Sequence, residues 1–233
     1  MKRIAFIASL ALALVALSAS SASIITKPVN VDPFDRIVTK GKFDIKYYPG
    51  DQSVKICGPQ AAVDKFSLQV VNGVLTIDSG KTTFIRNDKL VVYVSTPTLK
   101  GVRIEGAGDF EADRGVVGKN VELTVAGAGD IDVKRLEAET VKISINGAGD
   151  IDLENTSCET LEITVNGAGE ADIEGLECRK LDANINGAGS ADLSGHAQEA
   201  TIILNGAGGI DISELRCDNI NSQINGIGKI KRY

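Results

Sequence analysis

The sequence lacks the residue types on which several kinds of binding site depend. It has no Trp, and aromatic residues make up 4% of the chain, so stacking platforms for sugars or nucleobases are scarce. It has one His and four Cys, and no two Cys form a Cys-x-x-Cys pair, which argues against a zinc site. Ligands that need aromatic stacking or thiolate-bound metal are therefore poor candidates for this chain.

Positive charge is scarce in the second part of the chain. The formal net charge is −6, and residues 101–233 hold 12 basic and 24 acidic side chains. Residues 24–100 hold 11 basic and 7 acidic side chains, so the imbalance lies beyond residue 100. A surface this acidic repels phosphate backbones, and we expect no nucleic-acid partner.

The only long apolar run lies at the N-terminus. Lys2 and Arg3 precede an almost wholly apolar stretch at 4–17, and Ser20-Ser21-Ala22 offers small residues for cleavage. This pattern predicts a signal peptide over residues 1–22, since the run is shorter than the roughly 20 residues of a membrane-spanning helix. We expect an exported protein, at the cell surface, in the periplasm or outside the cell, that spans no membrane after cleavage.

A glycine-rich motif recurs along residues 101–233. Its copies read EGAGD, AGAGD, NGAGD, NGAGE, NGAGS, NGAGG and NGIGK. They begin at Glu105, Ala126, Asn146, Asn166, Asn186, Asn205 and Asn225, with spacings of 21, 20, 20, 20, 19 and 20 residues. A constant period of this size indicates a repeat architecture in which successive units stack.

The residues around each motif alternate between apolar and polar. Val141, Ile143 and Ile145 precede one motif, and Ile151 and Leu153 follow it. Alternation with period two is typical of half-buried strands, so each repeat reads as strand, Gly-x-Gly turn, strand and return loop. We expect the paired glycines to supply positive φ. The fold predicted is all-β: a right-handed, single-stranded parallel β-helix with coils of about 20 residues.

Stacked coils turn recurring residues into columns. One column is a predicted structural ladder in which amide side chains hydrogen-bond from coil to coil, with ligand binding as the alternative. It consists of Asn146, Asn166, Asn186, Asn205 and Asn225. A second column consists of Ala138, Cys158, Cys178, Ala197 and Cys217. We expect stacked thiols there, while a Cys158–Cys178 disulfide stays open because an exported protein could form one.

Two further columns are acidic and start four and six residues past each motif start. The carboxylates could bridge calcium ions, which prefer oxygen ligands, or could simply form a solvated face. The calcium candidates are Asp130, Asp132, Asp150, Asp152, Glu170 and Asp172. No other cofactor is expected. The sequence departs from the calcium-binding Gly-Gly-x-Gly-x-Asp nonapeptide, because Ile151 stands where that motif needs Asp.

Residues 24–100 are β-rich but less regular. Asn72-Gly73 between two alternating runs is a strong hairpin signal. We expect this part to cap the regular coils of 101–233 without forming a separate domain. At the other end, the basic residues of 229–233 look suited to block an exposed strand edge or to dock a partner.

From Val31 onward the chain resembles the head GIN domain family of auto-transporter adhesins, which share a pectin-lyase-like β-helix shape. The resemblance rests on Pro33-Phe34-Asp35-Arg36-Ile37, on Phe43-Asp44-Ile45, on 72–77 (NGVLTI) and on the repeated Asn-Gly-Ala-Gly. It implies cell adhesion and brings no catalytic residues with it.

The sequence therefore favours a non-catalytic module for surface adhesion or recognition, whose partner would be an unidentified surface or envelope protein or glycan, and which could oligomerise. A structural scaffold in the periplasm or envelope is the alternative. A polysaccharide-active enzyme is the weaker alternative, because the acidic pairs follow the repeat instead of breaking it, and His196 has no argued partner.

Overall fold

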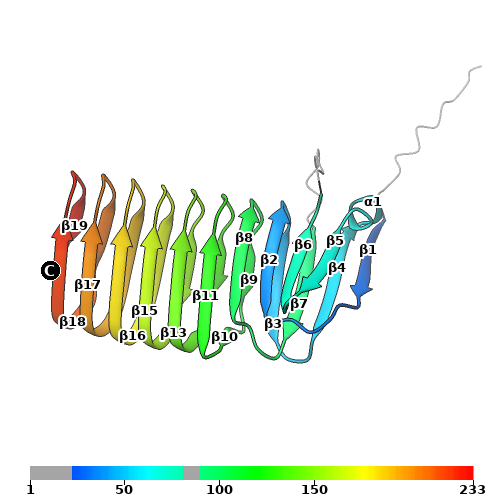
Figure 1. Ribbon diagram of the computed structural model, residues 1–233, viewed down its shortest axis with the longest axis horizontal. Coiled ribbons are helices and arrows are strands. Elements are labelled where there is room, and N and C mark those ends of the chain that lie inside the picture. Colours follow the sequence, from blue (N-terminus) through cyan, green and yellow to red (C-terminus); the bar gives the residue numbers. More distant parts are fainter. Residues whose placement is uncertain (1–22, 81–89, 233) are drawn as a thin grey trace, which may run out of the picture.

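The computed structural model describes residues 23–80 and 90–232, and the predicted signal peptide lies outside the described residues. The chain is a parallel β-helix of about seven turns, as the 20-residue period predicts (Figure 1). All strands of the described residues join one continuous sheet, which winds along the axis of the rod.

Residues 101–232 form the regular coils. Their strands are β8 (Gly101–Gly106), β9 (Phe110–Ala112), β10 (Val116–Val117), β11 (Asn120–Val125), β12 (Ile131–Val133), β13 (Leu136–Ile145), β14 (Ile151–Glu154), β15 (Thr156–Val165), β16 (Glu170–Ile185), β17 (Ser190–Leu204), β18 (Gly209–Ile224) and β19 (Lys229–Lys231). Each residue pairs with its equivalent one coil further on, as Val141 does with Leu161, and Leu161 with Leu181. These three side chains are fully buried, so the alternating apolar positions of successive coils form one stacked core.

The motif glycines are required for close stacking, and the prediction that they supply positive φ was wrong. None of the glycines with positive φ belongs to a Gly-x-Gly motif. A Cβ added at Gly147 would lie 2.0 Å from the carbonyl oxygen of Gly127, and one at Gly167 would lie 2.0 Å from that of Gly147. The turn backbones of adjacent coils hydrogen-bond directly to each other, and Ala168 N donates to Gly147 O at 3.0 Å. Only glycine lets the turns approach this closely.

The predicted return loop is replaced by strand in the last coils. β16, β17 and β18 each run without a break from one motif to the next. His196 lies within β17 opposite Glu177 and Arg216. The 19-residue spacing is absorbed by an irregularity in register after Ile173, where Gly195 adopts φ +120°.

Residues 24–100 contain β1 (Ile24–Val29), β2 (Arg36–Gly41), β3 (Asp44–Pro49), β4 (Ser53–Pro59), α1 (Gln60–Val63), β5 (Ser67–Val71), β6 (Val74–Asp78) and β7 (Val91–Thr96). β4 pairs antiparallel with β1 and β7, and β5 and β6 form the predicted hairpin. At its tip Asn72 and Gly73 both have positive φ, as a tight two-residue turn requires. β2 pairs in parallel with β8, and β3 with β9, so the ladder continues into the regular coils. The short helix α1 was not predicted.

Candidate interaction surface

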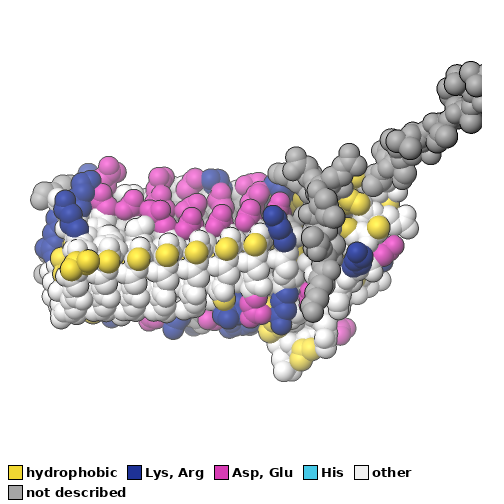
Figure 2. Space-filling view, turned by 90° about the horizontal axis from the view of Figure 1, so that it is seen from above, with side chains coloured by type: hydrophobic (Ala, Val, Ile, Leu, Met, Phe, Trp, Pro, Cys, Tyr) yellow, Lys and Arg dark blue, Asp and Glu magenta, His cyan; other side chains and the backbone are white. Residues whose placement is uncertain are grey.

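Acidic side chains form rows along one side of the rod (Figure 2). We call this side the acidic face, and it carries the two acidic columns of the repeat. In the outer column, successive residues are register partners in adjacent coils, so their strands lie about 4.8 Å apart. This column consists of Glu111, Asp132, Asp152, Asp172, Asp192 and Asp211. The face therefore presents the same chemical group once per coil.

The inner acidic column has a structural role. The carboxylate of Asp109 accepts a hydrogen bond from the backbone N–H of Asp130 at 3.2 Å. Asp130 accepts one from Asp150 N at 2.9 Å, and Asp150 accepts one from Glu170 N at 2.8 Å. Each of these three carboxylates thus binds the backbone of the next coil, beside the glycine turn.

The outer column is less well neutralised in its middle. Burial raises the pKa of Asp152 to about 6, and the nearby charges of Asp172 and Asp132 add to the effect. Burial also raises the pKa of Asp172, together with the charge of Glu174. At the end of the column Lys231 lies 2.7 Å from Asp211 and, with Ser213, holds the pKa of that carboxyl below its ordinary value.

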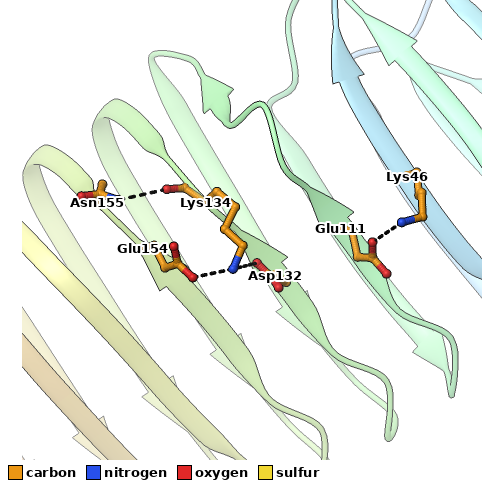
Figure 3. Close-up of polar contacts among 6 residues, drawn as sticks. All are labelled: Lys46, Glu111, Asp132, Lys134, Glu154 and Asn155. Atoms are coloured by element: carbon orange, nitrogen blue, oxygen red, sulfur yellow. Dashed lines mark hydrogen bonds and ion pairs between the residues drawn. The ribbon is translucent and has the colours of Figure 1, made fainter.

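Lysines bridge parts of the acidic face, and these bridges were not predicted from the sequence (Figure 3). Lys134 Nζ binds the Glu154 carboxylate of the next coil and lies 3.6 Å from Asp132 Oδ1 (Figure 3). Lys46 makes the same kind of contact with Glu111, at 2.5 Å. The sequence does carry a signal for such a bridge. A basic residue and an acidic residue occupy positions that lie side by side in adjacent coils. These bridges reduce the negative charge of the face near β9, β12 and β14.

The calcium candidates are spread over three coils. Two of them, Asp130 and Asp150, use one carboxylate oxygen each to accept backbone hydrogen bonds, and Asp132 has Lys134 nearby. Within 23–80 and 90–232, no three His, Cys, Asp or Glu side chains are grouped so that they could hold a metal ion. We therefore build no metal site from these residues.

The asparagine column forms a chain of side-chain hydrogen bonds. Asn166 Nδ2 donates to Asn146 Oδ1 at 2.8 Å, and Asn186 donates to Asn166 at 2.9 Å. Asn205 and Asn225 continue the chain at 2.8 Å each. Because these amides bond to one another, the column links the coils next to the turns.

The cysteine column faces the core side of the coils. Cys158 and Cys178 are register partners, as are Ala197 and Cys217, and all four cysteines of the chain are free thiols. The thiol of Cys158 beside it and burial raise the pKa of Cys178. The same thiol–thiol contact lowers the pKa of Cys158, and the cysteine side chains of this column pack against the apolar core.

The hollows described on the surface are open grooves. One lies between the outer acidic column and the end of the rod, lined by residues that include Asp172, Asp192, Asp211 and Lys231. Another is lined mainly by β2, β8 and β11, with Arg36, Arg103 and Glu122 at its polar side. Neither brings an acid and a base together in an enclosed pocket.

The chain matches the model of a known protein family. The family model described as "Putative auto-transporter adhesin, head GIN domain" matches residues 33–194 and 154–233. Among curated proteins, none matches the chain. No helix within the described part of the chain has the length and apolar character needed to cross a membrane.

Solved structures share the fold at low sequence identity. A putative adhesin from Bacteroides fragilis NCTC 9343 has a TM-score of 0.80 and 23% identity, over 91% of this chain and 98% of that one. A putative adhesin from Parabacteroides distasonis ATCC 8503 has a TM-score of 0.75 and 16% identity, over 91% and 98%. A putative lipid binding protein from the same strain has a TM-score of 0.70 and 22% identity, also over 91% and 98%. At these identities the likeness establishes the fold alone.

Proposed function

The chain belongs to the head GIN domain family described as putative auto-transporter adhesins, and from this premise we propose that it is an exported, non-catalytic recognition module. It binds a protein or glycan on another surface through the acidic face. The observation that carries the proposal is the repetition of one carboxylate per coil, half-buried or exposed, along that face.

A repeating face supports binding by many weak contacts. A ligand with its own regular spacing can contact several coils at once, and the contacts then reinforce one another without a deep pocket. The outer column suits this role better than the inner one, because the inner carboxylates Asp109, Asp130 and Asp150 are occupied by backbone N–H groups. Basic groups on the ligand would meet the column between Asp152 and Asp192.

Two features support a non-catalytic role. The carboxylates follow the repeat, whereas a general acid and base need two different environments at one place. Among the thiols, Cys178 has the most strongly shifted pKa; its side chain is buried and its pKa is raised. An envelope scaffold would share these features, and its location distinguishes it from a surface module.

The first test asks where the protein lies in the cell. Protease is added to intact cells, and the protein is then detected by antibody in each fraction. Loss of the signal from intact cells is expected. Protection until the outer membrane is opened would contradict surface recognition and favour the scaffold.

The second test asks whether the acidic face binds. The purified protein is applied to glycan arrays and extracellular-matrix proteins, and the triple variant Asp132→Asn/Asp172→Asn/Asp192→Asn is expected to lose binding. The matched control, Glu139→Gln/Glu162→Gln/Glu199→Gln, removes the same charge from positions outside the acidic columns and should keep it. Equal losses in both variants would contradict a role for this face and indicate a general charge effect.

A further inference from the structure

In the part of the chain that the structure describes, one segment of the last coil has an uncovered strand edge. β19 pairs only with Gly209–Asp211 of β18. Among residues 23–80 and 90–232, none pairs with the outer side of Ile220–Ile224. Ile220 and Ile224 occupy the same columns as Leu181 and Ile185, which are 0% exposed, yet they are 38% and 46% exposed. Within 23–80 and 90–232, the end of the apolar core is therefore uncovered at this segment.

The backbone of this segment is directed outward for pairing. Asn225 N donates to Leu204 O at 2.7 Å, so the polar groups of Asn225 face the rod. Because the hydrogen-bonding direction alternates along a strand, the N–H and C=O groups of Ile220, Ser222 and Ile224 face away from it. A row of unpaired groups at a strand edge is a template for another strand.

Residues 219–225 also lack the charges that usually protect a strand edge. They include no charged residue, whereas the equivalent segment of every inner coil has at least one. In β11, β13, β15, β16 and β17 those charged residues are Glu122, Lys142, Glu162, Lys180, Asp182 and Glu199. The neighbouring strand β19 has Lys229 and Lys231, so the same end of the rod carries one protected and one unprotected edge.

The uncharged segment reads nearly the same in both directions. Its sequence is Asn-Ile-Asn-Ser-Gln-Ile-Asn. Residues at equal distances on either side of Ser222 are chemically alike: Asn matches Gln, Ile matches Ile, and Asn matches Asn. A two-fold symmetric interface requires this self-complementarity, since each residue meets its mirror position on the partner.

We propose that the protein forms a homodimer in which Ile220–Ile224 pairs antiparallel with the same segment of a second copy, with the two-fold axis at Ser222. In this register Ile220 faces the partner's Ile224, and Asn221 faces the partner's Gln223. The outward-facing residues of both copies exchange backbone hydrogen bonds, and the four isoleucines cover the open ends of the two cores. The inference rests on the strand edge alone and is independent of ligand binding by the acidic face.

The test measures the mass of the protein by analytical ultracentrifugation over a range of concentrations. The unaltered protein is expected to be a dimer. The variant Asn221→Lys/Gln223→Lys places lysines opposite lysines and should weaken dimerisation at least about tenfold. The variant Asn221→Lys/Gln223→Glu places the introduced lysine of each copy opposite the introduced glutamate of the other and should restore the dimer.

The paired variants make the register testable. Both side chains are exposed, so circular dichroism and the melting temperature should show that each variant folds. A monomer at every concentration of the unaltered protein would overturn the proposal. So would a lysine variant that stays dimeric, or a lysine–glutamate variant that stays as monomeric as the lysine variant.

Discussion

The motif glycines of the regular coils lie where neighbouring backbones touch, whereas Gly73 in residues 24–100 lies where the chain must turn. Gly147 and Gly167 have ordinary φ and no room for a Cβ. Gly73 has φ +75°, and the nearest atom to an added Cβ is 3.6 Å away. The same residue type thus serves packing at the motif positions and backbone conformation at the hairpin tip, and the two roles respond differently to substitution.

The largest expected effect is a methyl group added between two coils. Gly167→Ala should lower the free energy of unfolding by about 3 kcal/mol or more, because its Cβ would lie 2.0 Å from a backbone oxygen that cannot rotate away. Gly73→Ala should cost only about 1 kcal/mol, the usual strain of a left-handed residue with free space around it. Urea unfolding followed by circular dichroism measures both. An equal cost for the two substitutions would contradict the distinction between the two glycine roles.

A smaller effect is expected along the asparagine column. Asn166 donates one ladder bond and accepts another, while Asn146 accepts one. Asn166→Ala should therefore cost about 1–2 kcal/mol, and Asn146→Ala about half as much, because each net hydrogen bond contributes roughly 1 kcal/mol. The melting temperatures of the two variants test the ratio. If the two costs were the same, the ladder would not act as a chain of equal bonds.

The stacking of the coils can be predicted from the sequence better than the side-chain contacts on their surface. The 20-residue period determines which residues stack, so the columns of Asn166 and Cys178 follow from the sequence alone. The period does not give φ, because a glycine needed for a turn and a glycine needed for close approach look the same in a sequence. It also does not predict which carboxylates are engaged. Asp130 and Asp132 look alike in the sequence, but Asp130 accepts a hydrogen bond from the backbone N–H of Asp150, whereas Asp132 Oδ1 lies 3.6 Å from Lys134 Nζ.

The N-terminal part was harder to predict because its pairing partners are far apart in sequence and follow no period. The Asn72-Gly73 hairpin was recognisable from local turn chemistry alone. The antiparallel pairing of β4 with β1 and β7 depends on tertiary contacts, and so does the short helix α1 that ends at Val63.

The outer acidic column allows a comparison between its middle and its end. Asp152 has a pKa of about 6 in the folded protein against an ordinary value of 3.8, so the protonated form favours folding. Its stabilising contribution is complete below about pH 4 and is lost as the pH rises through about 6. Asp152→Asn should therefore raise the melting temperature at pH 7.5, by an effect of about 1 kcal/mol or less because solvent screens the site.

Asp211, at the end of the column, should behave in the opposite way. Lys231 holds its pKa below the ordinary value, so its contribution is present near neutral pH and is lost as the pH falls. Asp211→Asn should lower the melting temperature at pH 7.5, and the Asp152→Asn difference should vanish at pH 3.5. Shifts of the same sign for both variants at pH 7.5 would contradict this account of the column.

The smallest expected effect is that of calcium. Asp130 and Asp150 of the inner column already accept backbone hydrogen bonds, Lys134 lies between Asp132 and Glu154, and within the described residues no three carboxylates are grouped so that they could hold an ion. We expect millimolar calcium, or a chelator, to change the melting temperature by less than about 1 °C, well under the shift of roughly 2–4 °C that 1 kcal/mol produces in a domain of this size. A larger rise with calcium that is absent from Asp132→Asn/Asp152→Asn/Asp172→Asn would show that the outer column binds the ion. A rise that persists in that variant would place the ion elsewhere on the protein.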